Sequence, residues 1–463
     1  MSDQEWGTEA QPRPTDMDTA EHRVLFDQGR EPEPAGQDPP ETSPAQPEGD
    51  GDHDAGGHDE GSMRQVDDAR LQILDQIRTL EPIELPLAEA FGCVLASDIV
   101  ALSALPPFAS SAMDGFAVRA SDIAAAGPDR PVSLKVVGRS MAGHPPDATV
   151  GAGEAMRIAT GAPVPAGADA ILPVEHAWLQ GDSVQATRAF DEGAYVRPSG
   201  QDASEGELLI PAGRRISAPE LGLVASAGYG SILVHPRPRV AILATGDELV
   251  EPGRQAPFGA IRDSNSFTLF GGVRETGAVP VLGGIVKDEV DELRDAILGL
   301  TTRSDCFISS GGVSVGERDV VKMAFFRRGD VAFYRVAMQP GMPQGFGNVE
   351  GRPYFGLPGN PVSVFVSFEV FIRPALLKMM GRRDLFRPEV EAILDTDISG
   401  PVNKTVFARV RVRREAHRWV ASSTGPGQSN LLSTVARANG LADTLTVGSN
   451  KIDEPDTLTF PTT

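Results

Sequence analysis

The sequence has few aromatic residues, two cysteines and no long apolar run, and each shortage excludes a class of protein. Cys93 and Cys306 stand far apart in apolar surroundings, so the chain has neither zinc-ligand spacing nor a CxxC redox pair. We expect Cys306 to be a buried, reduced thiol. No stretch approaches the roughly 18 apolar residues of a membrane span, and the acidic N-terminus lacks a signal-peptide pattern. These absences predict a soluble, cytoplasmic protein.

Basic patches are also scarce. The formal net charge is −22, but residues 1–62 hold 17 acidic residues and three arginines, which leaves only −8 for the rest of the chain. This balance argues against a nucleic-acid binder, whose affinity comes mostly from basic patches. Residues 1–62 have too little apolar surface to offset the entropy of ordering, so we expect a disordered acidic tail. Such a tail is either a solubilising segment or a docking peptide.

After residue 62 the patterns predict a multidomain protein of the α/β plus β class. Segments 63–92 and 190–235 are expected to form a linking helical and extended domain. It would contain an amphipathic helix from about residue 65 to 80 and a second helix that Ser217 and Glu220 cap. Residues 93–189 alternate short strands with Pro/Gly turns, which predicts a β-rich domain.

The clearest unit is 236–381, where buried strands alternate with amphipathic helices. This alternation predicts a doubly wound α/β domain with a parallel sheet covered on both faces. Its last helix is expected to begin at Asn360 and Pro361 and to kink at Pro374. Residues 382–463 change to strand-like alternation, with valine and alanine at 406, 408, 410 and 412, and predict a small C-terminal β-barrel-like domain.

Five loops rich in glycine and small residues directly follow apolar runs and point to function. They are 111–115 (SAMDG), 160–163 (TGAP), 245–248 (TGDE), 309–314 (SSGGVS) and 357–361 (LPGNP). Backbone N–H groups exposed after a strand suit a phosphate or oxyanion, and an aspartate at a strand end suits a hard metal ion. Loops at the carboxyl ends of strands converge in a doubly wound sheet, so the last three loops should share a site. The ligand is therefore expected to be large, phosphate-bearing and metal-assisted.

Candidate residues follow from these loops. The candidate substrate-binding residues are Thr245, Gly246, Ser309, Ser310, Gly311, Gly312, Ser314, Pro358, Gly359, Asn360 and Pro361. The candidate magnesium ligands are Asp247, Asp263 and Asp319, because Mg²⁺ usually takes one or two carboxylates plus substrate oxygens. Helix capping is the alternative role of Asp263, and a first-turn helix acid is that of Asp319. Asp288 is expected to cap the helix that follows it.

Three segments in this order also resemble a known family. The segments 239–249 (RVAILATGDEL), 309–317 (SSGGVSVGE) and 357–363 (LPGNPVS) are similar to those of molybdopterin molybdenumtransferases, which include the molybdenum-cofactor domain of gephyrin. The resemblance covers the chain from about residue 67 onward. It implies an enzyme of molybdenum cofactor biosynthesis that takes adenylated molybdopterin and molybdate, uses Mg²⁺ and releases AMP. A molybdopterin adenylyltransferase and a non-catalytic, gephyrin-like scaffold are the alternatives.

The resemblance also implicates residues outside 236–381. It implies catalytic roles for Asp114, Asp202 and Glu220 beside Asp247, and a substrate-binding role for Thr160. Asp114 has an alternative role as the first residue of an Asp-Gly turn. Since these residues belong to different regions, the resemblance implies a cleft that the second subunit of a homodimer completes. It also suggests a molybdopterin adenylyltransferase or the recipient molybdoenzymes as protein partners, with no nucleic acid and no membrane.

One motif departs from the family. Many members have Lys-Pro-Gly-Lys-Pro where this chain has Gln339-Pro340-Gly341-Met342-Pro343. Gln339 remains a candidate substrate-binding residue because its amide can donate hydrogen bonds, whereas a methionine cannot replace a charge. Either the nearby cations Arg262, Arg318 and Lys322 compensate, or the chain is a divergent paralogue with altered activity.

Overall fold

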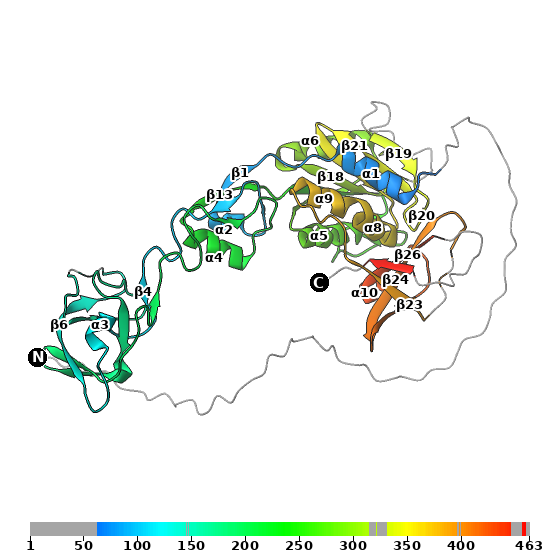
Figure 1. The fold of residues 1–463 in the computed structure, drawn as a ribbon. Coiled ribbons are helices and arrows are strands. Elements are labelled where there is room, and N and C mark those ends of the chain that lie inside the picture. The colour runs from blue at the N-terminus through cyan, green and yellow to red at the C-terminus, as the bar shows by residue number, and fades with distance from the viewer. Residues whose placement is uncertain are drawn as a thin grey trace, which may run out of the picture. The chain divides into compact units, whose positions relative to one another are not determined.

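The computed structural model describes residues 63–144, 146, 148–313, 321, 331–395, 398, 400–445 and 456–459 (Figure 1). These residues form several sheets, each with its own apolar core, so the architecture is multidomain and of the mixed α/β class. None of the helices within these ranges combines the length and the apolarity that a membrane crossing requires. The acidic segment 1–62 and the predictions about it lie outside the described residues.

The first helix, α1 (Val66–Gln76), buries Val66, Ala69, Ile73 and Leu74 against the same core as α9 (Arg373–Met379). The prediction that it continues to residue 80 is wrong. Ile77 is already extended, and the backbone N–H of Leu80 donates to the carbonyl of Met379 at 2.8 Å. The segment after Gln76 therefore bonds to the end of α9 instead of adding another helical turn.

Two stretches far apart in sequence pack together in the next unit. Strands β1 (Ile83–Pro86), β13 (Ser231–His235) and β2 (Val94–Leu95) form one sheet, and β12 (Leu208–Ile210) pairs with β3 (Ile99–Val100). Helices α2 (Leu87–Ala90) and α4 (Ala218–Ser226) belong to the same unit. The predicted capping box of α4 is confirmed, since Ser217 caps it and the carboxylate of Glu220 accepts the backbone N–H of Ser217 at 3.1 Å.

A six-stranded sheet dominates residues 110–186. Its order is β8 (Ala170–Pro173), β5 (Gly115–Val118), β7 (Glu154–Ile158), β6 (Val132–Ser140), β10 (Ser183–Ala186) and β9 (Ala177–Gln180). Helix α3 (Ala120–Ile123) and the helical turn η1 (Val174–His176) connect its strands, and β4 (Ser110–Ser111) pairs separately with β11 (Val196–Arg197). A side chain at position 115 would overlap the carbonyl oxygen of Leu172, so the Asp-Gly turn requires glycine at that position.

The α/β sheet has the order β17 (Val279–Val286), β14 (Arg239–Thr245), β18 (Cys306–Ser310), β22 (Arg352–Leu357), β21 (Pro343–Val349) and β19 (Val331–Arg335). The first four strands are parallel, as predicted, but β21 runs antiparallel to both of its neighbours, β22 and β19. The expectation of a wholly parallel sheet is therefore wrong at this edge. The β21–β22 link is a short hairpin, and a connection that short can join only antiparallel strands.

Helices cover both faces of this sheet. Along β14, Val240 and Ile242 pack with α5 (Asn265–Thr276) and the helix after Asn360, whereas Ala241 and Leu243 pack with α6 (Val290–Leu300). The helix after Asn360 runs through α8 (Pro361–Ser367), a π-helical turn η4 (Phe368–Ile372) and α9. The π-turn ends two residues before Pro374, which lacks the N–H that an unbroken α-helix would use. Short elements η2 (Thr301–Arg303), β15 (Leu249–Val250) and β16 (Ile261–Arg262) complete the unit.

The last sheet contains β24 (Thr405–Glu415), β25 (Arg418–Ser423), β23 (Glu389–Leu394), β27 (Asp456–Thr459) and β26 (Gly440–Leu445). Their pairings form a closed ring because β26 also pairs with β24. Val406, Ala408, Val410 and Val412 share one core, so the predicted alternation along β24 is confirmed. The opposite face is also covered near Arg409, where α10 (Leu432–Arg437) lies against β24 (Figure 1). Strand β20 (Met338–Gln339) pairs with β24 and links this sheet to the α/β unit.

Candidate functional site

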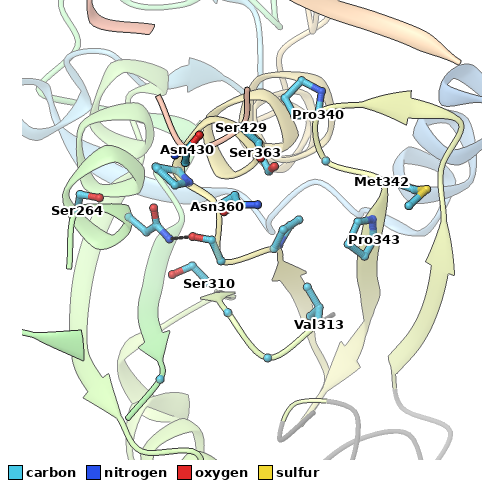
Figure 2. A pocket seen from close by; sticks show the side chains of 18 of the residues that line it. Ser264, Ser310, Val313, Pro340, Met342, Pro343, Asn360, Ser363, Ser429 and Asn430 are labelled. Carbon is cyan, nitrogen blue, oxygen red and sulfur yellow. Dashed lines mark hydrogen bonds between the residues drawn. The ribbon is translucent and has the colours of Figure 1, made fainter. Parts of the chain in front are cut away.

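A pocket of about 1380 Å³ lies where the carboxyl ends of β14, β18 and β22 meet. Segments of the α/β unit line most of it, and residues of the last sheet line the remainder. Figure 2 shows Ser310, Asn360, Met342 and Ser429 around this space. The lining comes from Thr245, Gly246, Glu248 and Leu249, from 261–265, Asp288, 310–313, 338–343, 358–361 and Ser363, and from Pro401, Lys404 and 427–430.

Most of the candidate substrate-binding residues come together in this pocket. They are Thr245, Gly246, Ser310, Gly311, Gly312, Gln339, Pro358, Gly359, Asn360 and Pro361. Ser309 does not line it, because this serine is fully buried and its hydroxyl pairs with that of Tyr354 at 2.5 Å. Ser314 lies outside the described residues. Alternation along β18 therefore turns Ser309 into the core and leaves Ser310 at the pocket.

The backbones of these loops approach each other closely. Gly311 has a positive φ of 95°, and a side chain there would overlap the carbonyl oxygen of Thr245. Its N–H donates to the carbonyl of Leu357 at 3.0 Å. The side-chain amide of Asn265 donates to the carbonyl of Gly359 at 2.7 Å (Figure 2). These contacts hold the loops after β14, β18 and β22 in one fixed arrangement.

Two buried polar atoms of lining residues lack a partner in the described part of the chain. They are the hydroxyl oxygen of Ser310 and the side-chain oxygen of Asn265. Buried polar atoms in proteins are nearly always hydrogen-bonded, so unpaired ones require an explanation such as a ligand or ordered water. Ser310 belongs to the loop 309–314, and Asn265 bonds to the loop 357–361 through Gly359. The pocket wall that these two loops form is therefore polar.

Carboxylates gather at one side of the pocket. Glu248 and Asp288 line it, and the carboxylate of Asp247 accepts the backbone N–H of Asp288 at 3.3 Å. Partial burial, together with the negative charges of Asp247 and Glu248, raises the pKa of Asp288 above its usual range. The expectation that Asp288 caps a helix is wrong, since α6 begins only at Val290 with Glu289 as its capping residue.

The other metal candidates have different surroundings. Asp263 lines the pocket but is buried, and its carboxylate accepts the N–H of Ser266 at 3.0 Å, so it caps the start of α5. Asp319 lies outside the described residues. Within the described ranges, no group of three histidine, cysteine or acidic side chains converges as a complete metal site.

Positive charge reaches the pocket from Arg262 and from Lys404, both of which line it. The ammonium of Lys404 lies 3.6 Å from the sulfur of Met342, and the guanidinium of Arg335 lies 3.6 Å from the same sulfur. Two cations therefore flank the position at which the family often has a lysine. The other cations expected to compensate, Arg318 and Lys322, lie outside the described residues.

The sequence did not predict the contributions of Lys404, Asp288 and the loop 427–430. Lys404 directly precedes β24, and the pairing of β24 with β20 places it beside Met342. No local sequence pattern predicts a pairing between strands so far apart in the chain. The segment 425–430 (GPGQSN) could have been identified as a site loop, because it has the same glycine-rich, small-residue composition as the other site loops.

The candidates outside the α/β unit do not line this pocket. Asp114 and Thr160 lie together, since the carboxylate of Asp114 accepts the backbone N–H of Thr160 at 2.7 Å and its hydroxyl at 3.0 Å. The backbone N–H bond, helped by the hydroxyl, lowers the pKa of Asp114. Glu220 caps α4 and also accepts from Arg214 at 3.3 Å, and hydrogen bonding to Ser217 lowers its pKa. Asp202 is exposed, and its backbone N–H donates to Leu105 at 2.8 Å.

Three family models match consecutive parts of the chain. Residues 64–228 match the MoeA N-terminal region (domain I and II), residues 241–378 a probable molybdopterin binding domain, and residues 391–444 the MoeA C-terminal region (domain IV). The candidates Asp114, Thr160, Asp202 and Glu220 lie in the part that matches the first model. The residues that line the pocket lie in the parts that match the second and third models.

Curated proteins and solved structures give the same result. Molybdopterin molybdenumtransferase 2 of Mycobacterium tuberculosis is 42% identical over 387 residues, which is 82% of this chain and 95% of the relative. The molybdopterin molybdenumtransferase of Haemophilus influenzae is 33% identical over 384 residues, with coverage of 81% and 93%. A structure of the molybdopterin biosynthesis MoeA protein from Pyrococcus horikoshii has a TM-score of 0.67 at 27% identity and covers 86% of this chain and all of its own.

Proposed function

This chain belongs to the molybdopterin molybdenumtransferase family, and we propose that it catalyses the insertion of molybdenum into molybdopterin during molybdenum cofactor biosynthesis. The observation that carries the proposal is the pocket at the carboxyl ends of β14, β18 and β22. It combines glycine loops, unpaired polar atoms and two lining cations in one space. That combination suits a substrate that bears both phosphates and a separate oxyanion.

The volume of the pocket supports adenylated molybdopterin as the substrate. Pockets for small molecules commonly measure about 300–1,000 Å³, and this one is larger at about 1380 Å³. A pterin joined to a nucleotide through phosphates requires such a space. The glycine loops that contain Gly311 and Gly359 would bind the phosphates through backbone N–H groups, which have no side chains to obstruct a close approach.

Molybdate is the proposed second substrate, and Lys404 is the proposed main source of charge for its binding. Lys404 lines the pocket, and its ammonium lies 3.6 Å from the sulfur of Met342. Gln339, also in the lining, can donate a hydrogen bond from its amide. In this proposal the positive charge that the family often carries at position 342 is supplied by a neighbouring segment of this chain.

The carboxylate side of the pocket fits Mg²⁺. Glu248, Asp288 and Asp247 concentrate negative charge, and partial burial together with the charges of Asp247 and Glu248 raises the pKa of Asp288. Mg²⁺ usually takes one or two carboxylates and fills its remaining positions with water and phosphate oxygens. Glu248 and Asp288 would hold the ion, which when bound would neutralise charge on the phosphates. Asp247 would orient Asp288 through its bond to the Asp288 N–H.

A homodimer is part of the proposal. Asp114 with Thr160, Asp202 and Glu220 belong to the region that matches the MoeA N-terminal model, and none lines the pocket of its own chain. A second copy would bring such groups to the substrate. The hydrogen bonds from Thr160 lower the pKa of Asp114 and so favour the ionised carboxylate that such a role requires.

The test is to incubate the purified full-length protein with adenylated molybdopterin, Mg²⁺ and molybdate, and then to add an apo-molybdoenzyme. We expect AMP release together with reconstitution of the molybdoenzyme. If the protein instead loads AMP from ATP onto bare molybdopterin, the adenylyltransferase hypothesis replaces this one. Absence of both activities, beside an active positive control, would reject catalysis of either kind.

A further inference from the structure

Arg409 is a buried cation whose described partners are all neutral. Its side chain extends from β24 on the face opposite the valines, and the residue is 4% exposed. Its guanidinium donates to the hydroxyl of Thr434 at 3.1 Å and to the carbonyls of Pro426 and Gln428 at 2.6 and 3.4 Å. Burying a charge without a counterion is costly, and burial lowers the pKa of this group. A contribution to stability alone therefore does not explain an arginine here.

The loop that Arg409 contacts is a wall of the pocket. Two of its carbonyls point to the guanidinium, and a third, that of Ser429, accepts the backbone N–H of Val362 at 3.0 Å. The loop is thus fixed on one side by β24 and on the other by the start of α8. The lining includes Gly427, Gln428, Ser429 and Asn430, the last two of which are labelled in Figure 2.

The N–H groups of the same loop have no such partners. No residue in the described ranges accepts a hydrogen bond from the backbone N–H of 427, 428, 429 or 430. Three loop carbonyls are therefore committed to protein donors, whereas the N–H groups of 427–430 remain free to bind a ligand. Available N–H groups held in place on a rigid backbone suit an oxyanion, because they need no reorganisation when the anion arrives.

We propose that Arg409 is a positioning residue for the oxyanion substrate, which it does not touch but for which it holds the loop 425–430 in the binding conformation. The inference rests on the proposed function, in which that oxyanion is molybdate. The planar guanidinium reaches two carbonyls and one hydroxyl at once, a geometry that the single ammonium of a lysine cannot reproduce. Arg409→Lys should therefore keep the charge and lose part of the positioning.

The experiment compares Arg409→Met and Arg409→Lys with Arg411→Met in the full-length protein. Arg411 is the matched control, because it is an exposed arginine two residues further along the same strand. We expect Arg409→Met to raise the KM for molybdate at least tenfold with less than a threefold change in kcat. Arg409→Lys should fall between Arg409→Met and wild type, and Arg411→Met should match wild type. Equal KM values in Arg409→Met and Arg411→Met would overturn the inference.

A second measurement does not depend on activity. Hydrogen exchange of the loop amides 427–430 without substrate should be faster in Arg409→Met and Arg409→Lys than in Arg411→Met. If Arg409→Met does not fold, a cycle of Arg409→Lys with Ser429→Ala decides instead. Effects on KM that are less than additive support action through the loop, and additive effects contradict it. An inactive wild type would refute the proposed function, whereas an active wild type with unchanged loop exchange in Arg409→Lys would overturn only this inference.

Discussion

Replacing Met342 by lysine restores the residue that the family often has, yet we expect no gain in molybdate affinity. The new ammonium would lie close to Lys404 and Arg335, each of which is 3.6 Å from the present sulfur. Two unit charges 4 Å apart repel by roughly 4 kcal/mol at an effective dielectric constant of about 20. Arg335 is exposed, so water screens much of its contribution to this repulsion.

The opposing contribution is the hydrogen bond that the new ammonium would make to the anion. A charge-assisted bond contributes roughly 1.5–3 kcal/mol. Repulsion from Lys404 favours a neutral or outward-turned lysine at position 342, and a lysine in either state would not make that bond. The apparent affinity of Met342→Lys should therefore lie between unchanged and about tenfold weaker, where tenfold corresponds to about 1.4 kcal/mol. Lys404→Met should weaken binding by about tenfold or more, because it removes the charge that occupies this place.

The assay is a titration of molybdate against wild type, Met342→Lys, Lys404→Met and the control Met342→Leu, which removes the thioether without adding charge. Calorimetry or equilibrium dialysis gives the four dissociation constants. Tightening of tenfold or more in Met342→Lys would refute the reasoning, and the chain would then be a paralogue with weakened anion binding. An unchanged constant in Lys404→Met would equally count against Lys404 as the relocated charge.

Three further predictions follow from contacts elsewhere in the chain. Thr160→Ala should raise the pKa of Asp114 toward the ordinary value of an aspartate, as an NMR titration of the carboxylate can measure. Because the pKa of Asp114 is lowered in the folded state, its hydrogen bonds to Thr160 stabilise the fold above about pH 4, and this stabilisation is lost as the pH falls through the folded-state pKa. Acid stability of Thr160→Ala equal to that of wild type would contradict this argument. Gly311→Ala should destabilise the protein by about 1–3 kcal/mol, because position 311 has a positive φ and a side chain there would overlap Thr245. Gly271→Ala, where a side chain would meet open space on α5, should not destabilise it. Thermal melts of both variants measure the difference. Light scattering should give twice the chain mass of 49.0 kDa, and a monomer at micromolar concentration would exclude the homodimer.

Local chemistry made much of the α/β unit predictable. The apolar run 240–244 gave a central strand because each of its side chains is buried on one face or the other. Ser217 and Glu220 specified the start of α4, since a capping box needs only four consecutive residues. The glycine loops after three parallel strands converge because strand direction alone brings their carboxyl ends to one edge.

What the sequence did not reveal depends on contacts between distant segments. Lys404 reaches the pocket only through the pairing of β20 with β24, two strands more than 60 residues apart in the chain. The burial of Ser309 depends on its neighbour Tyr354, which lies 45 residues further along the chain. The antiparallel edge of the sheet follows from the hairpin between β21 and β22, which the periodicity of either strand does not show.

AMP release from adenylated molybdopterin by three proteins tests most directly whether this pocket performs the reaction. The proteins are wild type, Gly359→Trp, which fills the pocket, and Gly299→Trp, which adds the same side chain on the open surface of α6. With Mg²⁺ and molybdate present, wild type and Gly299→Trp are expected to release AMP and Gly359→Trp is not. Full activity in Gly359→Trp would show that the reaction occurs elsewhere, and no release by any of the three would contradict the activity itself.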